Sequence, residues 1–266
     1  MVGADILILF YSTLAGTATL LGILLMEKKQ QWALDYSHYV NSFAAGLIIA
    51  VAFFHLIPEA YEFIIENSKE SDLFPETGLI PFVAVFLGFL GFFMLENIVV
   101  LHSGAEIHYC IDEEGPHSPH VERLGVMAFS GLVFHSLIDG VIIGVGFEVS
   151  EEVGIFAALA VILHEVPEGI TSFAIMRRSM DLKKARYFAV IVALATPIGA
   201  IFSLLVVGSL DEATIGLMLA IAAGTFIYVS AADLIPETHE SNNLKNLIAF
   251  LIGAVFIYIL TLTFAE

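Results

Sequence analysis

Long apolar stretches separated by short polar segments dominate this chain. A helix needs about 20 mostly apolar residues to cross a hydrocarbon core of about 30 Å, and eight runs meet that length. The predicted spans are residues 6–26, 39–60, 79–101, 124–147, 153–176, 187–208, 213–235 and 244–263. The pattern therefore predicts an all-α polytopic membrane protein with eight transmembrane helices, in which residues 1–266 form a single transmembrane domain. The first run has no basic residue before it and is too long for a signal-peptide core, so we interpret it as a retained span.

The composition agrees with this interpretation and excludes several classes. Hydrophobic residues make up 58% of the chain and charged residues only 14%, whereas a soluble domain carries about 25% charged residues. So few charges cannot cover a water-soluble globule, which excludes a soluble enzyme. Lys and Arg total 10 against 28 Asp and Glu, which argues against a nucleic-acid partner. The single cysteine, Cys110, excludes an intrachain disulfide and a CxxC metal site.

The basic residues predict the orientation in the membrane. If the eight spans alternate in direction, one side holds nine of the ten basic residues: Lys28, Lys29, Arg123, Arg177, Arg178, Lys183, Lys184, Arg186 and Lys245. Only Lys69 falls on the other side. Basic loops stay in the cytoplasm, so both termini are expected outside, and the plasma (cytoplasmic) membrane is the default location.

The loops on the outer side are acidic. They carry Glu62, Glu66, Glu70, Asp72, Glu76, Glu148, Glu151, Glu152, Asp211 and Glu212. Such a field attracts cations to the outer face and repels anions, although the same charges can serve only to keep the loops hydrated.

An internal repeat links spans 2 and 7. At a shift of 178 residues, Ala45–Glu62 aligns with Ala223–Glu240, and nine of eighteen positions are identical. The identical positions include the run Leu-Ile-Pro-Glu, at 56–59 and again at 234–237. Because the two spans cross in opposite directions in the predicted topology, the repeat is inverted, which is typical of transporters with a site between two related halves.

Spans 4 and 5 carry the matched pair of motifs that this symmetry predicts. Span 4 contains His135-Ser136-Leu137-Ile138-Asp139-Gly140, and span 5 contains His164-Glu165-Val166-Pro167-Glu168-Gly169. Both segments read as histidine, polar residue, two spacers, acid and glycine. Residues four apart share a helix face, so each span presents one imidazole and one carboxylate together.

Two imidazoles and two carboxylates make a donor set suited to Zn²⁺, Fe²⁺ or Mn²⁺. Ser136 and Glu165 lie one position further, about 100° around each helix, and can serve a neighbouring second site. A lone histidine within a membrane is often a hydrogen-bonded packing residue, but intramembrane acids are costly unless they are paired or functional. The motifs therefore predict a metal site. Pro167 removes one backbone hydrogen bond within span 5, and a local break of this kind can offer freed carbonyls to an ion.

These paired motifs resemble those of the ZIP (Zrt/Irt-like) family of divalent-metal transporters. The resemblance covers nearly the whole chain, including eight spans, external termini and a His-containing loop after span 3. It implies that spans 1–3 and 6–8 are inverted repeats around the central pair of spans 4 and 5. It also implies uptake of zinc, or of iron, manganese or cadmium, into the cytoplasm as a transported substrate, with no prosthetic group. The positions that match the primary site of the family are His135, Asp139, His164 and Glu168, with Ser136 and Glu165 beside them.

One departure from the family pattern concerns span 6. Some bacterial members carry a glutamate before the proline of that span, which completes a second, binuclear site. Here the stretch reads Ala195-Thr196-Pro197, so the acid is missing. A mononuclear site, or a weak second site through Ser136 and Glu165, is therefore expected.

Further polar residues lie near the ends of other spans. His55 and Glu59, at the outer end of span 2, are the expected entrance. The expected exit comprises Glu96 of span 3 and, at the inner end of span 7, Asp233, Glu237 and His239. The alternative is that each Pro-Glu pair only ends its helix and that Glu96 is a buried, hydrogen-bonded acid.

The segment 102–123 is polar and rich in histidine. It contains His102, His108, Cys110, His117 and His120. We expect a flexible cytoplasmic loop; its spacing matches no structural zinc module, and a metal-collecting role is left open.

The sequence favours a secondary transporter working by alternating access over two other classes. No GxxxxGK[ST] motif is present, so ATP is not a direct energy source in this chain. An intramembrane zinc hydrolase is the first alternative, because His164-Glu165 begins like H-E-x-x-H, but Glu168 stands where the second histidine belongs. A divalent-cation channel is the second, because pores also use acidic and histidine rings. The expected partners are divalent ions and lipid, and a homodimer is left open.

Overall fold

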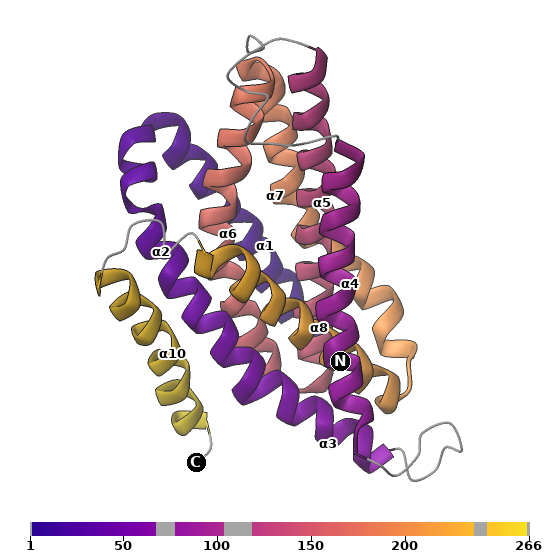
Figure 1. Ribbon diagram of the computed structural model, residues 1–266. Helices are drawn as coiled ribbons and strands as arrows, with labels where there is room; N and C mark the ends of the chain where they lie inside the picture. Colours follow the sequence, from indigo (N-terminus) through magenta and orange to yellow (C-terminus); the bar gives the residue numbers. More distant parts are fainter. Residues whose placement is uncertain (1, 68–77, 104–118, 237–243, 265–266) are drawn as a thin grey trace.

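The computed structural model describes residues 2–67, 78–103, 119–236 and 244–264, and the regular structure in these ranges is helical (Figure 1). In chain order the elements are α1 (Val2–Lys28), α2 (Gln30–Val51), the π-helix η1 (Ala52–Leu56), α3 (Ile57–Asn67), α4 (Ile80–Ser103), α5 (Pro119–Val149), α6 (Glu151–Ser179), α7 (Leu182–Val206), the 3₁₀-helix η3 (Val207–Ser209), α8 (Glu212–Tyr228), the π-helix η4 (Val229–Leu234) and α10 (Leu244–Phe264).

The helices confirm the predicted all-α class of an integral membrane protein. Among the described residues, seven helical stretches are long and apolar enough to cross a membrane: Gly3–Lys28, His38–Glu66, Phe129–Val149, Glu151–Ala174, Leu182–Ser209, Glu212–Ala232 and Leu244–Leu262. The apolar stretch Ile80–Leu95 of α4 is shorter. The eight-span count therefore stays a prediction that depends on α4.

Short polar caps set where several helices begin. Ser150 alone separates α5 from α6, and its hydroxyl accepts a hydrogen bond from the Val153 amide at 3.1 Å. Asp181 caps α7 in the same way, and Asp211 caps α8. Such caps satisfy backbone N–H groups that have no partner in the first turn, so tight turns suffice between adjacent spans.

Helix α2 begins earlier than the hydropathy pattern predicts. It starts at Gln30, nine residues before the predicted span at 39, and its first turns include exposed Trp32 and Tyr36, whose rings stack with centroids 5.2 Å apart. Hydropathy identifies only the apolar part of a helix, so this amphipathic beginning was missed.

The central pair of the fold is α5 and α6. Helix α1 packs along α6, α7 packs along α5, and α1 and α7 also contact each other. Around this group, α2 packs with α10 and contacts α6, while α8 packs with α4 and α3 (Figure 1). The spans that carry the predicted metal ligands therefore lie in the middle of the bundle.

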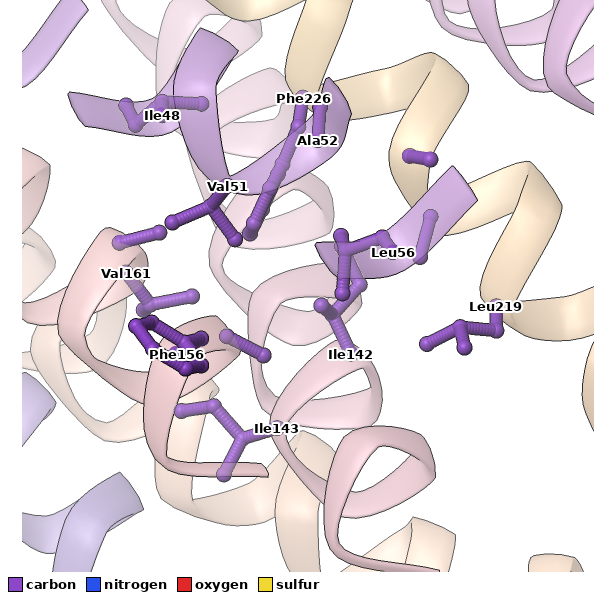
Figure 2. Close-up of a cluster of buried hydrophobic side chains, with 14 of the residues drawn as sticks. Ile48, Val51, Ala52, Leu56, Ile142, Ile143, Phe156, Val161, Leu219 and Phe226 are labelled. Atoms are coloured by element: carbon purple, nitrogen blue, oxygen red, sulfur yellow. The ribbon is translucent and has the colours of Figure 1, made fainter. Parts of the chain in front are cut away.

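Two apolar clusters leave the middle of α5 and α6 free for polar groups. One cluster joins α2, η1, α8 and the stretches 142–147 of α5 and 153–161 of α6 (Figure 2). The other joins the C-terminal part of α1 and the start of α7 to residues 170–176 of α6 and to Met180, which follows that helix. Residues 135–139 and 164–168 lie between these clusters along both helices.

Close helix crossings recur at matched sequence offsets. A side chain at Gly22 would clash with the carbonyl oxygen of Val166 where α1 crosses α6, and one at Gly199 would clash with that of Leu137 where α7 crosses α5. The two glycines are 177 positions apart, and the two carbonyls are 29 apart. The same shifts relate Gly169 beside Thr19 to Gly140 beside Thr196.

A second set of crossings behaves in the same way. Gly46 of α2 lies against the Phe250 carbonyl of α10, and Gly224 of α8, 178 positions later, lies against the Val85 carbonyl of α4. The two π-helices also fall in the aligned repeat, because Ala52–Leu56 shifted by 178 coincides with residues 230–234 of η4. Matched contacts of this kind are expected if an internal repeat relates the two halves.

Candidate metal site

Four of the predicted ligands converge between α5 and α6. One donor atom from each of His135, Asp139, His164 and Glu168 lies within 4.8 Å of the others. We call these residues the four-donor group. The side chains of Asp139 and His164 are each 3% exposed and that of His135 is 15% exposed, so His135 is the most accessible of these three.

The spacing of the donors fits a tetrahedral ion. Nε2 of His164 lies 3.2 Å from Oδ2 of Asp139, and Nε2 of His135 lies 3.3 Å from the same oxygen. Nε2 of His135 also lies 3.4 Å from Oε2 of Glu168. Zinc with bonds of about 2.0–2.1 Å separates its tetrahedral ligand atoms by about 3.3–3.4 Å, so three of the six edges already have the required length.

The imidazole of His164 is oriented by its own helix. Its Nδ1 lies 2.9 Å from the carbonyl oxygen of Ala160, one turn earlier in α6. When Nδ1–H donates to that carbonyl, Nε2 keeps its lone pair and points to the four-donor group. Metal-binding histidines commonly have a second hydrogen bond of this kind, which fixes the tautomer and the ring orientation.

His135 and Glu168 are held by neighbours from other helices. The ring of Phe92 on α4 meets the His135 ring edge-on, with centroids 5.3 Å apart. The Ser136 hydroxyl donates to Oε1 of Glu168 at 2.9 Å, while the buried Oε2 of Glu168 has no hydrogen-bond partner. The carboxylate is thus fixed at one oxygen and presents the other to the four-donor group.

The carboxylate of Glu165 contacts α1 and α7 and does not belong to the four-donor group. It is fully buried, and its two carboxylate oxygens accept hydrogen bonds from Thr196 of α7, at 2.6 Å, and from Thr19 of α1. Ser136 and Glu165 therefore lie beside the four-donor group, and both of their side chains have hydrogen-bond partners.

Helix α6 runs continuously through Pro167. Proline removes one backbone hydrogen bond, but the helix on either side is held by close contacts at Gly22 with Val166 and at Gly169 with Thr19. That a freed carbonyl near Pro167 binds an ion stays a prediction.

The predicted entrance residues lie on different elements. His55, in η1, is 6% exposed; its Nε2 lies 2.7 Å from the Thr261 hydroxyl of α10, and its ring stacks on Phe156 with centroids 3.4 Å apart. Glu59, in the first turn of α3, is half-buried. Neither belongs to the four-donor group.

Half of the predicted exit lies outside the described residues. Glu237 and His239 are in the segment 237–243, and most of the predicted loop, residues 104–118, falls in another such segment. Glu96 is placed in α4 and Asp233 in η4, as parts of the helix backbone. Helix α4 continues to Ser103 and α5 begins at Pro119, so helix enters both ends of the segment predicted as the loop 102–123.

Comparison with known proteins decides the family. The sequence profile of the ZIP zinc transporters matches residues 2–126 and 108–261. The chain belongs to the ZIP zinc transporter family. A hydrolase is thereby excluded, because this is a family of transporters.

Individual ZIP relatives extend over most of the chain. Zinc transporter 3 of Arabidopsis thaliana is 27% identical over 240 residues, which is 80% of this chain and 70% of that protein. Zinc transporter zipt-7.1 of Caenorhabditis briggsae is 30% identical over 68% of this chain and 56% of its own length. Zinc transporter ZIP13 of Mus musculus is 25% identical over 84% of this chain and 67% of its own length.

Two residues of this ZIP chain, Thr19 and Thr196, were not predicted as part of the site. Single threonines in apolar helices carry no signal by themselves, because most of them bond to their own backbone. The available signal was the pattern Ala-Thr-x-x-Gly, which occurs at 18–22 and again at 195–199.

Proposed function

We propose that this ZIP family member carries divalent transition-metal ions, above all Zn²⁺, across the membrane into the cytoplasm through the four-donor group. The observation that carries the proposal is the convergence of two imidazoles and two carboxylates, with one donor atom of each within 4.8 Å of the others and three of the separations between 3.2 and 3.4 Å. Nitrogen and oxygen ligands of this kind suit Zn²⁺, Fe²⁺ and Mn²⁺, and a soft ion such as Cd²⁺ is held less well by them.

The ion is the transported substrate, and its charge balances the site. Two carboxylates packed among apolar helices repel each other unless a cation or protons accompany them. A divalent ion neutralises Asp139 and Glu168 while the histidines stay uncharged. Entry of the ion therefore replaces its hydration shell with four protein donors and removes the electrostatic cost of the empty site.

We further propose an inverted repeat and alternating access. The matched crossings at Gly22 and Gly199, and at Gly46 and Gly224, support two related halves around α5 and α6. In an inverted repeat the two halves can exchange conformations, so that a central site faces one side and then the other. This account includes eight spans, external termini and a location in the plasma (cytoplasmic) membrane.

The proposed route passes from the outer acids to the inner end of the predicted span 7. Glu59 is the better placed of the two entrance residues, because His55 is already engaged by Thr261 and Phe156. Glu96, Asp233, Glu237 and His239 are the proposed exit, and Ser136 and Glu165 flank the central ion.

Uptake into sealed proteoliposomes tests this function. Purified wild-type protein is compared with His164→Ala and Asp139→Ala, using a zinc-sensitive dye trapped inside. His38→Ala and Asp35→Ala are matched controls, since they remove the same side-chain types from α2, away from the four-donor group. We expect saturable influx that falls at least tenfold in the two site variants and stays unchanged in the controls. Influx that does not saturate would favour a channel, and unchanged influx in both site variants would contradict the proposed site.

A further inference from the structure

Glu165 connects three helices at the level of the four-donor group. Its Oε1 accepts a hydrogen bond from Thr196 of α7 at 2.6 Å, and its Oε2 accepts one from Thr19 of α1. Glu165, Thr19 and Thr196 are each fully buried. A carboxylate on α6 is therefore held between two neighbouring helices, with one hydroxyl on each oxygen.

The two threonines occupy equivalent places in the two halves. Each stands in an Ala-Thr-x-x-Gly segment, and the two are 177 positions apart. Each also lies at a close helix crossing, because the Thr19 carbonyl packs on Gly169 and the Thr196 carbonyl packs on Gly140. The hydroxyls thus come from backbone positions that leave little freedom to move.

We propose that Glu165 is a positioning residue and not a metal ligand, and that the chain holds a single ion at this level. The inference rests on the proposed function of the four-donor group. By fixing α6 between α1 and α7, Glu165 sets the register of its neighbours His164 and Glu168. We call the Thr19–Glu165–Thr196 contact the threonine clamp. It connects α6 to α1 and α7 by hydrogen bonds, where a second ion would otherwise be the connection.

The other groups available for a second ion are engaged as well. The Ser136 hydroxyl donates to Oε1 of Glu168 and to the Leu132 carbonyl, at 2.9 and 3.0 Å. Position 195, one residue before Thr196, is alanine and offers no donor. Among the residues that the structure describes, Glu165 is also absent from the group whose donor atoms could share one ion.

The clamp matters for binding because ligand geometry has to be accurate. A productive site tolerates displacements of about 0.5 Å, and groups that orient ligands typically change metal affinity about 10–100-fold when removed. His164 and Glu168 flank Glu165 in sequence, so a rotation of α6 about its axis would displace both ligands together.

Metal binding to the purified full-length chain tests the proposal. Zinc stoichiometry and affinity are measured by calorimetry and elemental analysis, and the Co²⁺-loaded protein is examined by visible absorption, whose bands report the ligand geometry. The variants are Glu165→Gln, the double variant Thr19→Val/Thr196→Val and the double variant Thr19→Ser/Thr196→Ser, with Glu168→Gln as the ligand comparison.

We expect one Zn²⁺ per wild-type chain. Glu165→Gln should keep one ion with less than threefold loss of affinity and an unchanged Co²⁺ spectrum, because its amide oxygen and nitrogen can still bond to the two hydroxyls. The valine double variant should bind Zn²⁺ about 10–100-fold more weakly with an altered Co²⁺ spectrum. The serine double variant keeps both hydroxyls and should behave as wild type.

Three results of the binding measurements would overturn the proposal. The first is a stoichiometry of two Zn²⁺ in the wild type and one in Glu165→Gln. The second is a loss of zinc affinity in Glu165→Gln that is as large as the loss in Glu168→Gln. The third is wild-type affinity and spectrum in the valine double variant. Thermal unfolding without metal separates this proposal from the proposed function: the clamp predicts a lower Tm for the valine variant even if no zinc binds, and an unchanged Tm would refute it.

Discussion

Nε2 of His164 on α6 lies 3.2 Å from Oδ2 of Asp139 on α5, although the two residues are 25 positions apart. The contact joins the two central helices at the point where the apolar clusters on both sides end. His164 keeps this direction because its other ring nitrogen is held by the Ala160 carbonyl. Oδ2 of Asp139 also lies 3.3 Å from Nε2 of His135, so one carboxylate oxygen contacts both imidazoles of the four-donor group.

Zinc should stabilise the folded protein through this group. At a free concentration 100 times its Kd, a ligand that binds only the folded state adds about 2.7 kcal/mol to the free energy of unfolding. We expect a higher Tm in detergent with Zn²⁺, reversed by a chelator and lost in His164→Ala. His38→Ala is the control and should keep the shift; an equal shift in His164→Ala would show that zinc acts elsewhere.

The Ser136 hydroxyl should contribute to affinity without being a ligand. Ser136→Ala removes the hydrogen bond that fixes Oε1 of Glu168, and removal of such an orienting group typically costs about 10–100-fold in metal affinity. Ser136→Thr keeps a hydroxyl and should retain most of the metal affinity that Ser136→Ala loses. Binding titrations measure this affinity. Wild-type affinity in Ser136→Ala would show that the Ser136 hydroxyl does not contribute to metal binding.

Gly22 and Gly199 should be equally intolerant of substitution. A methyl group at either position meets a carbonyl oxygen of the neighbouring helix, and overpacking of this kind typically costs about 1–3 kcal/mol. We expect Gly22→Ala and Gly199→Ala to lower Tm by similar amounts, whereas Gly91→Ala on α4, with open space around it, should not lower Tm. Tolerance at one of the two crossings and not at the other would argue against equivalent halves.

His55 should act in packing more than in ion entry. His55→Phe keeps a ring against Phe156 but removes the hydrogen bond to Thr261, which is typically worth about 1 kcal/mol. We expect a lower Tm with the uptake KM unchanged, and a raised KM for Glu59→Gln. A several-fold higher KM for His55→Phe at wild-type stability would instead identify His55 as an entrance ligand.

Cysteine labelling distinguishes the predicted topology from one in which α4 does not cross. In a Cys110→Ser background, single cysteines replace Gln30, Leu79, Lys183 and Glu212, each of which is exposed near a helix start. With eight spans, an impermeant maleimide added to intact cells should label positions 79 and 212 and spare 30 and 183. Labelling of 79 together with 183 would mean that α4 fails to span the membrane.

The pairing of His135 with Asp139 and of His164 with Glu168 could be predicted from the sequence, because helical periodicity places residues four apart on one face. To predict that the two pairs converge, a further observation was needed: the segments 135–140 and 164–169 share one pattern. Thr19 and Thr196 escaped prediction because their role depends on how α1 and α7 cross α6, which no local pattern encodes.

The environment of His55 was beyond prediction for a similar reason. Its partner Thr261 is 206 positions away on α10, and that pairing arises only when α2 and α10 pack together. The π-helical backbone at η1 and η4 also departs from the regular period on which the prediction relied, since each π-turn adds a residue to the helical turn.

The most direct test of the account is X-ray absorption at the zinc edge of the metal-loaded protein. We predict four nitrogen and oxygen ligands at about 2.0–2.2 Å, with the outer-shell signal of two imidazoles. The imidazole signal should fall by half in His135→Ala and stay unchanged in His38→Ala. Sulfur ligation, or a spectrum that His135→Ala leaves as in the wild type, would contradict the claim that the four-donor group holds the ion.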